Sequence, residues 1–229
     1  MAITGGPFHG QDTTEDEFSR FAREFARDGV VGSIGDTTLK VTADSSGMTV
    51  SVAAGLIIGR GYWLRNTAAY AVTIAAAHAT LDRIDRIVAR FDPTTDAVAL
   101  VRLAGDTGAP TTPPALTQTD TGIYELPLAT VAVAHGVVTI AAGNVADERL
   151  FHPNPVRPWT TATRPAAPRK GQVGFNDTTG KVEFYNGATW VTIASGSLDA
   201  ATIEGRHILE GDSSPTAGDG ADGDLWLEY

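Results

Sequence analysis

The sequence predicts a mainly β protein, and three observations support that prediction. The 229-residue chain contains 25 Gly and 12 Pro, which favour turns, and only one segment, near the N-terminus, is signalled clearly as a helix. Residues 48–52 alternate apolar side chains with hydroxyl-bearing ones, as a half-buried strand requires. From residue 30 onward, short β-prone runs are separated by Gly, Asp and Ser. We therefore expect a central antiparallel β-sandwich-like domain over residues 30–150.

The expected helix lies in an N-terminal region, residues 1–29. Thr14 and Glu17 have the spacing of a capping box, and Gly29 is placed to end the helix. One face of this amphipathic helix carries three aromatic residues: Phe18, Phe21 and Phe25. These side chains can pack on the chain's own β-domain or against copies of the same helix, and the sequence leaves both alternatives open.

Within the central domain, residues 81–91 fit both a helical face and a strand. We expect a strand from about Arg86, because residues 92–96 are a strong turn signal and residues 97–103 have the pattern of a returning strand. Two later runs predict a further strand pair: residues 124–133 and 137–140.

Residues 151–170 contain five Pro and four basic residues but no acidic one. Such a segment cannot form a helix or a central strand, and we expect an extended Pro-rich connector. The sequence is equally compatible with a connector laid along a surface and with a mobile linker.

Residues 171–194 predict a small three-stranded β-meander, with a hairpin turn at Asn186-Gly187. So short a unit buries too little to stand alone, so we expect trimerisation to complete it. Its aromatic residues then join the helix in a candidate oligomer interface: Phe18, Phe21, Phe25, Phe175, Phe184 and Trp190. The last segment, residues 195–229, is acidic, and residues 215–226 partly repeat the pattern of residues 168–175.

Composition argues against several classes of function. The net charge of −10 makes nucleic acid a poor partner, and the absence of Cys removes thiolate metal sites and cysteine nucleophiles. No apolar run is long enough for a membrane helix, so we expect no membrane insertion. Residues 218–223 match a Gly-rich nucleotide loop in letters only, since no strand precedes them and no helix follows. We predict no cofactor and no metal site.

Catalytic patterns are equally weak, and we predict that the chain is not an enzyme. Four neighbouring charged residues are the best candidates for a poised carboxylate pair: Asp82, Arg83, Asp85 and Arg86. Ion pairs that hold a β-edge or a subunit interface are the favoured interpretation of this cluster. The five His residues show no zinc-binding spacing.

Several short segments, taken in order, resemble tail-tip and baseplate proteins of tailed bacteriophages: residues 29–31, 48–55, 59–63, 83–88, 126–129 and 147–149. The similarity covers roughly residues 14–150. Separately, residues 171–193 resemble small β-units of phage tail fibres, with the form Gly-Gln-x-x-Phe, turn, Tyr-Asn-Gly-x-x-Trp. These resemblances imply a homotrimeric structural protein of the distal tail of a virion, assembled in the host cytoplasm. Its partners would be other tail or baseplate proteins, and its role would be to anchor or begin the tail fibres for host attachment.

Two other functions are weighed against this one. The chain can be a receptor-binding protein that recognises host cell-wall carbohydrate through its C-terminal β-units, with Tyr185 or Trp226 as the residues that stack on a sugar. A polysaccharide depolymerase is the least favoured alternative.

Overall fold

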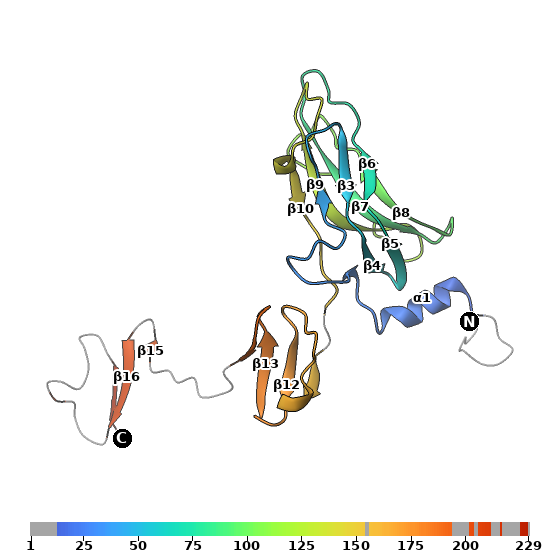
Figure 1. Ribbon diagram of the computed structural model, residues 1–229. Helices are drawn as coiled ribbons and strands as arrows, with labels where there is room; N and C mark the ends of the chain where they lie inside the picture. The colour runs from blue at the N-terminus through green and yellow to red at the C-terminus, as the bar shows by residue number, and fades with distance from the viewer. Residues whose placement is uncertain are drawn as a thin grey trace. The chain divides into compact units, whose positions relative to one another are not determined.

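The computed structural model describes residues 13–153, 156–193, 202–203, 206–211, 216 and 225–228. It confirms a mainly β protein with one helix near the N-terminus and several antiparallel sheets (Figure 1). The chain divides between Asn154 and Pro155 into two compact units, which are described separately below. Residues 218–223, the apparent Gly-rich loop, lie outside the described residues.

The helix, α1 (Glu15–Arg23), begins as its capping box predicts. The Thr14 hydroxyl accepts a hydrogen bond from the Glu17 amide at 3.2 Å, and the Glu17 carboxylate accepts one from the Thr14 amide at 3.0 Å. The predicted end at Gly29 is wrong, because α1 ends six residues earlier, at Arg23. Gly29 instead opens a strand at a positive φ of 141°, where a Cβ would lie 2.6 Å from the His152 amide nitrogen. Close backbone approach therefore explains this glycine.

The described residues of unit 1 form three sheets, whose named strands all pair antiparallel. The first sheet has the order β1 (Gly29–Val30), β4 (Gly55–Gly59), β5 (Tyr62–Asn66). The second has the order β2 (Val41–Thr42), β3 (Thr49–Val52), β6 (Tyr70–Thr73). The third has the order β10 (Val145–Asp147), β9 (Tyr124–Val133), β7 (Arg83–Asp92), β8 (Ala97–Leu103).

The third sheet shows where the strand predictions hold. The segment whose pattern fits both a helix and a strand forms a strand and not a helix: β7 spans Arg83–Asp92 and starts three residues before the expected position. β8 returns as expected. Residues 137–140 do not form the predicted partner of β9. That position is taken by β10, which follows a short 3-10 helix, η1 (Ala142–Asn144). A local pattern cannot choose between two candidate partners, because the choice depends on a long-range contact.

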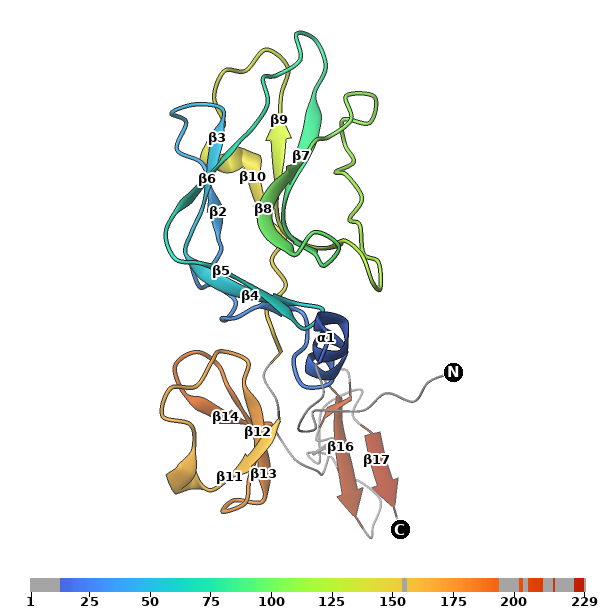
Figure 2. The ribbon, with the colours of Figure 1, turned by 90° about the vertical axis from the view of Figure 1, so that its right-hand side faces the viewer.

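One apolar core joins the sheets of unit 1. It includes Val52 of the second sheet, Ile57 of the first, and Ile87 and Leu128 of the third, all at most 1% exposed. Figure 2 shows the second and third sheets as two layers, which agrees with the predicted sandwich-like domain. Phe151 packs against this core and its backbone bridges to Val30, so unit 1 closes just beyond the expected boundary at residue 150.

Unit 2 contains a four-stranded sheet rather than a meander alone. The three expected antiparallel strands are present: β12 (Val173–Asn176), β13 (Lys181–Tyr185) and β14 (Trp190–Thr192). A fourth strand, β11 (Arg157–Trp159), pairs in parallel with β12 at the sheet edge and leads into a short 3-10 helix, η2 (Thr161–Thr163). Much of the segment expected as a connector therefore belongs to this unit.

A second sheet follows, with the order β15 (Thr202–Ile203), β16 (Arg206–Gly211), β17 (Leu225–Glu228). In both sheets of unit 2, the two strands of the parallel pair are separated by the same number of residues in the sequence. Arg157 pairs with Gly174 and Ile208 pairs with Leu225, seventeen residues apart in each case. This shared spacing agrees with the partial sequence repeat between residues 168–175 and 215–226.

Candidate interaction surfaces

Helix α1 contacts the β-domain through its polar face. Ser19 is fully buried, and its hydroxyl donates a hydrogen bond to the backbone carbonyl of Arg60 at 2.5 Å. Arg60 and Gly61 form the turn between β4 and β5, where a Cβ on Gly61 would lie 2.4 Å from the Ser19 carbonyl oxygen. Figures 1 and 2 show α1 beside this turn. A small residue on the helix meets a glycine on the hairpin, so the two backbones approach closely.

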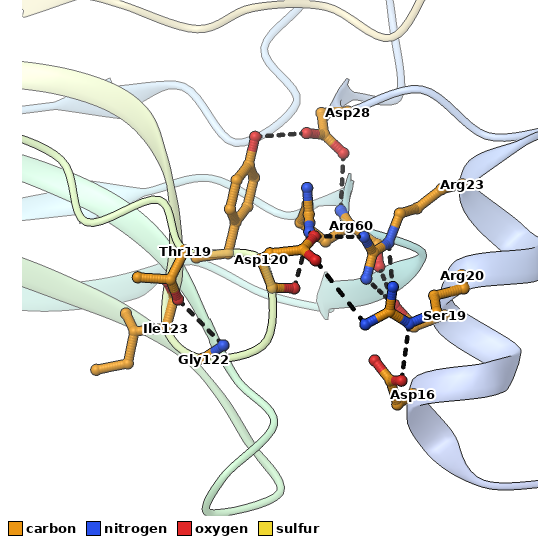
Figure 3. Close-up of polar contacts among 11 residues, drawn as sticks. Asp16, Ser19, Arg20, Arg23, Asp28, Arg60, Thr119, Asp120, Gly122 and Ile123 are labelled. Carbon is orange, nitrogen blue, oxygen red and sulfur yellow. Dashed lines mark hydrogen bonds and ion pairs between the residues drawn. The ribbon is translucent and has the colours of Figure 1, made fainter. Parts of the chain in front are cut away.

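At the edge of the contact between α1 and the β4–β5 turn, three arginines surround the carboxylate of Asp120 (Figure 3). Arg23 lies 3.0 Å from the Asp120 carboxylate, Arg20 lies 3.8 Å away, and Arg60 also pairs with it. Asp120 sits on an exposed loop, so each of these pairs contributes little to stability by itself. Together they orient the helix, because three side chains from two elements converge on one loop.

Asp28 ties the same turn to β9. Its carboxylate accepts a hydrogen bond from the Arg60 amide at 2.7 Å and another from the Tyr124 hydroxyl at 2.8 Å. Burial, followed by the hydrogen bond to Asp28, raises the pKa of Tyr124 to about 12. A cavity of about 360 Å³ lies beside this cluster, lined by acidic and basic residues alike. The arrangement is suited to docking the helix.

Because α1 uses its polar face inward, its aromatic face points outward. Phe18, Phe21 and Phe25 are 61%, 58% and 74% exposed, and the rings of Phe21 and Phe25 contact each other at 4.9 Å between centroids. Of the two alternatives left open by the sequence, packing of these residues on the chain's own β-domain is not what the structure shows. In the described part of the chain they form an exposed aromatic face.

Unit 2 also buries polar groups, around Glu183 on one face of its first sheet. The Glu183 carboxylate pairs with Arg164 at 2.6 Å and accepts hydrogen bonds from Asn176 at 2.9 Å and from the Trp159 indole at 3.3 Å. Its side chain is only 2% exposed. The Arg164 hydrogen bond, opposed by burial, is the main cause that lowers the pKa of Glu183 to about 2. Arg164 comes from the segment expected as a connector, which thereby covers this face.

Aromatic rings complete the covered face. The Trp159 ring lies over Gly174, where a Cβ would come within 2.0 Å of the ring. Trp190 contacts Trp159 at 4.7 Å and Tyr185 at 5.5 Å between ring centroids. Trp190 therefore packs within its own unit, and Tyr185 is half-buried, with part of its ring covered by Trp190.

The opposite face of this sheet is apolar. Strand register and the alternation of side chains place six residues on it: Val173, Phe175, Val182, Phe184, Val191 and Ile193. Phe175 is 41% exposed and Ile193 44%, while the polar residues Asn176 and Glu183 are buried on the covered face. This reverses the usual arrangement of a half-buried sheet, in which the apolar face lies inward. We call these six residues the apolar face.

The structure thus separates the six predicted interface residues into three groups. The three helical phenylalanines lie on unit 1, Phe175 and Phe184 share the apolar face of unit 2, and Trp190 lies on the covered face of unit 2. Trp226 belongs to β17, and its side chain is outside the described part of the chain. The sequence reasoning missed Glu183 and Arg164, because alternation alone would turn a glutamate between Val182 and Phe184 toward solvent.

The four charged residues within residues 82–86 form separate ion pairs, as expected, but not at a β-edge, because β7 lies between β9 and β8 in its sheet. Asp82 precedes β7 and contacts His135 at 2.8 Å. Arg83 pairs with buried Asp85 at 2.9 Å, and Asp85 also contacts Arg102 at 3.0 Å. Arg86 pairs with Glu148 of the segment after β10 at 2.9 Å. These contacts tie neighbouring strands and loops of the third sheet together, so two of the motifs that carry the phage resemblance are explained by structure.

In the described ranges, no group of three or more potential ligands could hold a metal ion. Among the same residues, no helix combines the length and apolar character needed to span a bilayer. Comparison of the chain with family models, curated proteins and solved structures found no match.

Proposed function

We propose that the chain is a non-enzymatic structural component of a phage tail tip or baseplate, which assembles as a homotrimer and anchors or begins the tail fibres. The order of its short motifs supports the phage assignment. The apolar face of unit 2 is the main support for self-assembly, because it is a continuous apolar sheet face opposite the buried polar residues Asn176 and Glu183.

Identical copies are suitable occupants of this face. The six residues include no charged side chain, so copies can approach one another without like-charge repulsion. Symmetric homo-oligomers commonly use one patch on every subunit, and apolar patches dominate such interfaces. Burial of six aliphatic and aromatic side chains from several copies would supply a core that the small sheet lacks by itself.

The mass of the purified full chain in solution tests this proposal. Sedimentation equilibrium should give about three times the chain mass of 23.9 kDa. Replacing both exposed members of the face, Phe175→Ser with Ile193→Ser, should shift the mass toward the monomer. Lys181→Ser is the matched control, since Lys181 is exposed on a strand of the same sheet but lies off the apolar face. A stable monomer with a cooperative melt would contradict the trimer.

The location in a virion requires a separate test. Antibodies raised against the chain should label the distal end of the tail in electron micrographs of the phage that encodes it. Labelling of the capsid, or of no part of the particle, would contradict the assignment to the tail tip whatever the oligomeric state.

A further inference from the structure

A groove in unit 1 lies between the start of α1 and the first residues of two strands, β5 and β8. Its volume is about 480 Å³. Its walls are largely apolar, and three large side chains on them are exposed: Phe18, Trp63 at 64% and Val98 at 49%. An exposed Trp beside two other apolar side chains marks an interaction surface, since Trp and Phe are enriched where proteins bind partners.

The charged residues that line this groove are all acidic. They are Glu15, Asp92 and Asp96, and no Lys, Arg or His lines it. Asp92 accepts hydrogen bonds from the amide and hydroxyl of Thr94, which stabilise its own turn. Glu15 and Asp96 form no ion pair with the described residues. Two unpaired carboxylates beside apolar walls therefore favour a ligand that carries positive charge as well as apolar groups.

Both strands that contribute to the groove are sheet edges. β5 ends the sheet β1-β4-β5, and β8 ends the sheet β10-β9-β7-β8. Outside their ladders with β4 and β7, neither strand forms a backbone hydrogen bond with described residues. An unpaired edge can accept an added strand, in which backbone hydrogen bonds supply affinity and side-chain contacts supply specificity. The edges therefore favour a ligand in extended conformation.

We infer that this groove binds an extended segment of another protein in which basic and apolar side chains alternate. A second copy of this chain is a poorer occupant, because part of its own basic segment already pairs within its own unit. Arg157–Trp159 pairs with β12, and Arg164 pairs with Glu183. The inference goes beyond the proposed self-assembly, which rests on unit 2.

Fluorescence anisotropy with a labelled peptide tests the inference. The probe is a short peptide in which Arg and Val alternate, titrated with the full chain at low salt. We expect saturable binding that weakens as salt is added, and no binding of a peptide with Glu in place of every Arg. A probe with N-methylated backbone amides, which cannot donate to a strand edge, should bind more weakly than its parent.

Substitutions in the groove locate the binding. Glu15→Gln with Asp96→Asn should weaken binding about fivefold, because two exposed charge pairs are lost. Both substitutions are chosen to leave the fold intact. The capping box uses Thr14 and Glu17 and not Glu15, and Asn tolerates the positive φ of 53° at position 96. Glu24→Gln with Asp177→Asn removes the same net charge at exposed positions outside the groove and should leave affinity unchanged.

Several results would overturn the inference. They are the absence of saturable binding, equal binding of the Arg and Glu peptides, equal losses in the groove and control variants, and undiminished binding of the N-methylated probe. If Trp63→Ala instead lowers the oligomeric mass while the Arg peptide fails to bind, a second copy covers the groove. The groove is tested by peptide affinity and by a substitution in unit 1, whereas the trimer is tested by substitutions in unit 2. Failure of one proposal can therefore be told apart from failure of the other.

Discussion

The two units of this chain bury different kinds of side chain. Unit 1 packs Val, Ile, Leu and Phe from three sheets into one apolar core. The first sheet of unit 2 instead covers Asn176 and Glu183 with Trp159 and Arg164, and leaves its apolar face only partly covered. The sheets of unit 1 are therefore held together by an apolar core, although helix α1 and the ends of two strands still expose apolar side chains. The strands of the first sheet of unit 2 are instead held together by a polar cluster, and its apolar face stays partly exposed.

The largest expected effect is in the core of unit 1. Phe91→Ala should lower the free energy of unfolding by about 4 kcal/mol, because a side chain only 1% exposed is replaced by a cavity. Its cross-strand partner Val98 is exposed and provides the control, since Val98→Ala should cost less than about 0.5 kcal/mol. The free energy of unfolding of unit 1 in both variants is measured by amide hydrogen exchange, resolved by segment. Similar losses for both variants would contradict the assigned core.

The next effect concerns the polar cluster of unit 2. Glu183→Ala should destabilise this unit by about 3 kcal/mol, because Arg164 and the buried Asn176 lose their partner. Denaturant unfolding followed by Trp fluorescence reports on this unit mainly through the packed Trp159 and Trp190, because Trp63 of unit 1 is already 64% exposed in the folded chain. Lys181→Ala, an exposed change on the same strand, should be close to neutral. If the two variants unfold alike, Glu183 does not hold the sheet together.

Acid should weaken unit 2 through the same carboxylate. The pKa of Glu183 is lowered from 4.5 to about 2, so its contribution to stability is present above pH 4.5 and is lost as the pH falls toward 2. Glu183→Gln should remove most of this dependence. The measurement is the unfolding midpoint, followed by Trp fluorescence, between pH 6 and pH 2. An equally steep dependence in the variant would assign the acid sensitivity to other groups.

A smaller loss is expected at the contact between Trp159 and Gly174. Gly174→Ala should destabilise unit 2 by about 2 kcal/mol, since the added Cβ would meet the indole ring at 2.0 Å. Gly143→Ala meets no atom within 4 Å and is the control. Unchanged contact between the Trp159 and Trp190 rings, seen as an unaltered near-ultraviolet circular dichroism spectrum, would argue against this packing.

The smallest changes in stability are expected for substitutions on the two faces of α1. Ser19→Ala should cost about 1 kcal/mol, because it removes the hydrogen bond from the helix to the Arg60 carbonyl. Phe21→Ser on the outward face should change the stability of the monomeric chain by less than about 0.5 kcal/mol. Thermal melts of both variants, made at a concentration where the chain is monomeric, test the assignment of inward and outward faces. A larger loss for Phe21→Ser would reverse it.

Some elements could be predicted because their causes are local. The capping box at Thr14 and Glu17 involves residues three apart, and the turn at Asn186-Gly187 joins two adjacent strands. Alternation located β3, and a turn signal after residue 91 correctly favoured a strand over a helix for residues 83–92. Such signals depend on neighbours in the chain, so no tertiary contact is needed to read them.

The faces that matter for function could not be assigned in this way. Alternation of polar and apolar residues divides a strand into two faces, but it does not say which face is covered. In unit 2 the cover comes from Trp159 and Arg164, which lie up to twenty-four residues from Glu183 in sequence. The helix shows the same limit, since its three phenylalanines predicted an apolar contact, whereas Ser19 makes the buried one with Arg60, forty-one residues away.

The sequence by itself determined the element types, the position of the helix start and the presence of a small aromatic-rich β-unit after the main β-domain. These follow from backbone preferences and the period of hydrophobic residues, which act over a few positions. Only the tertiary structure decided that polar groups lie inside the helix contact and the small sheet, while the phenylalanines of the helix and the apolar face of the sheet point outward. That choice depends on which distant segment covers each face, because a charged pair is tolerated in the interior only where a specific partner reaches it.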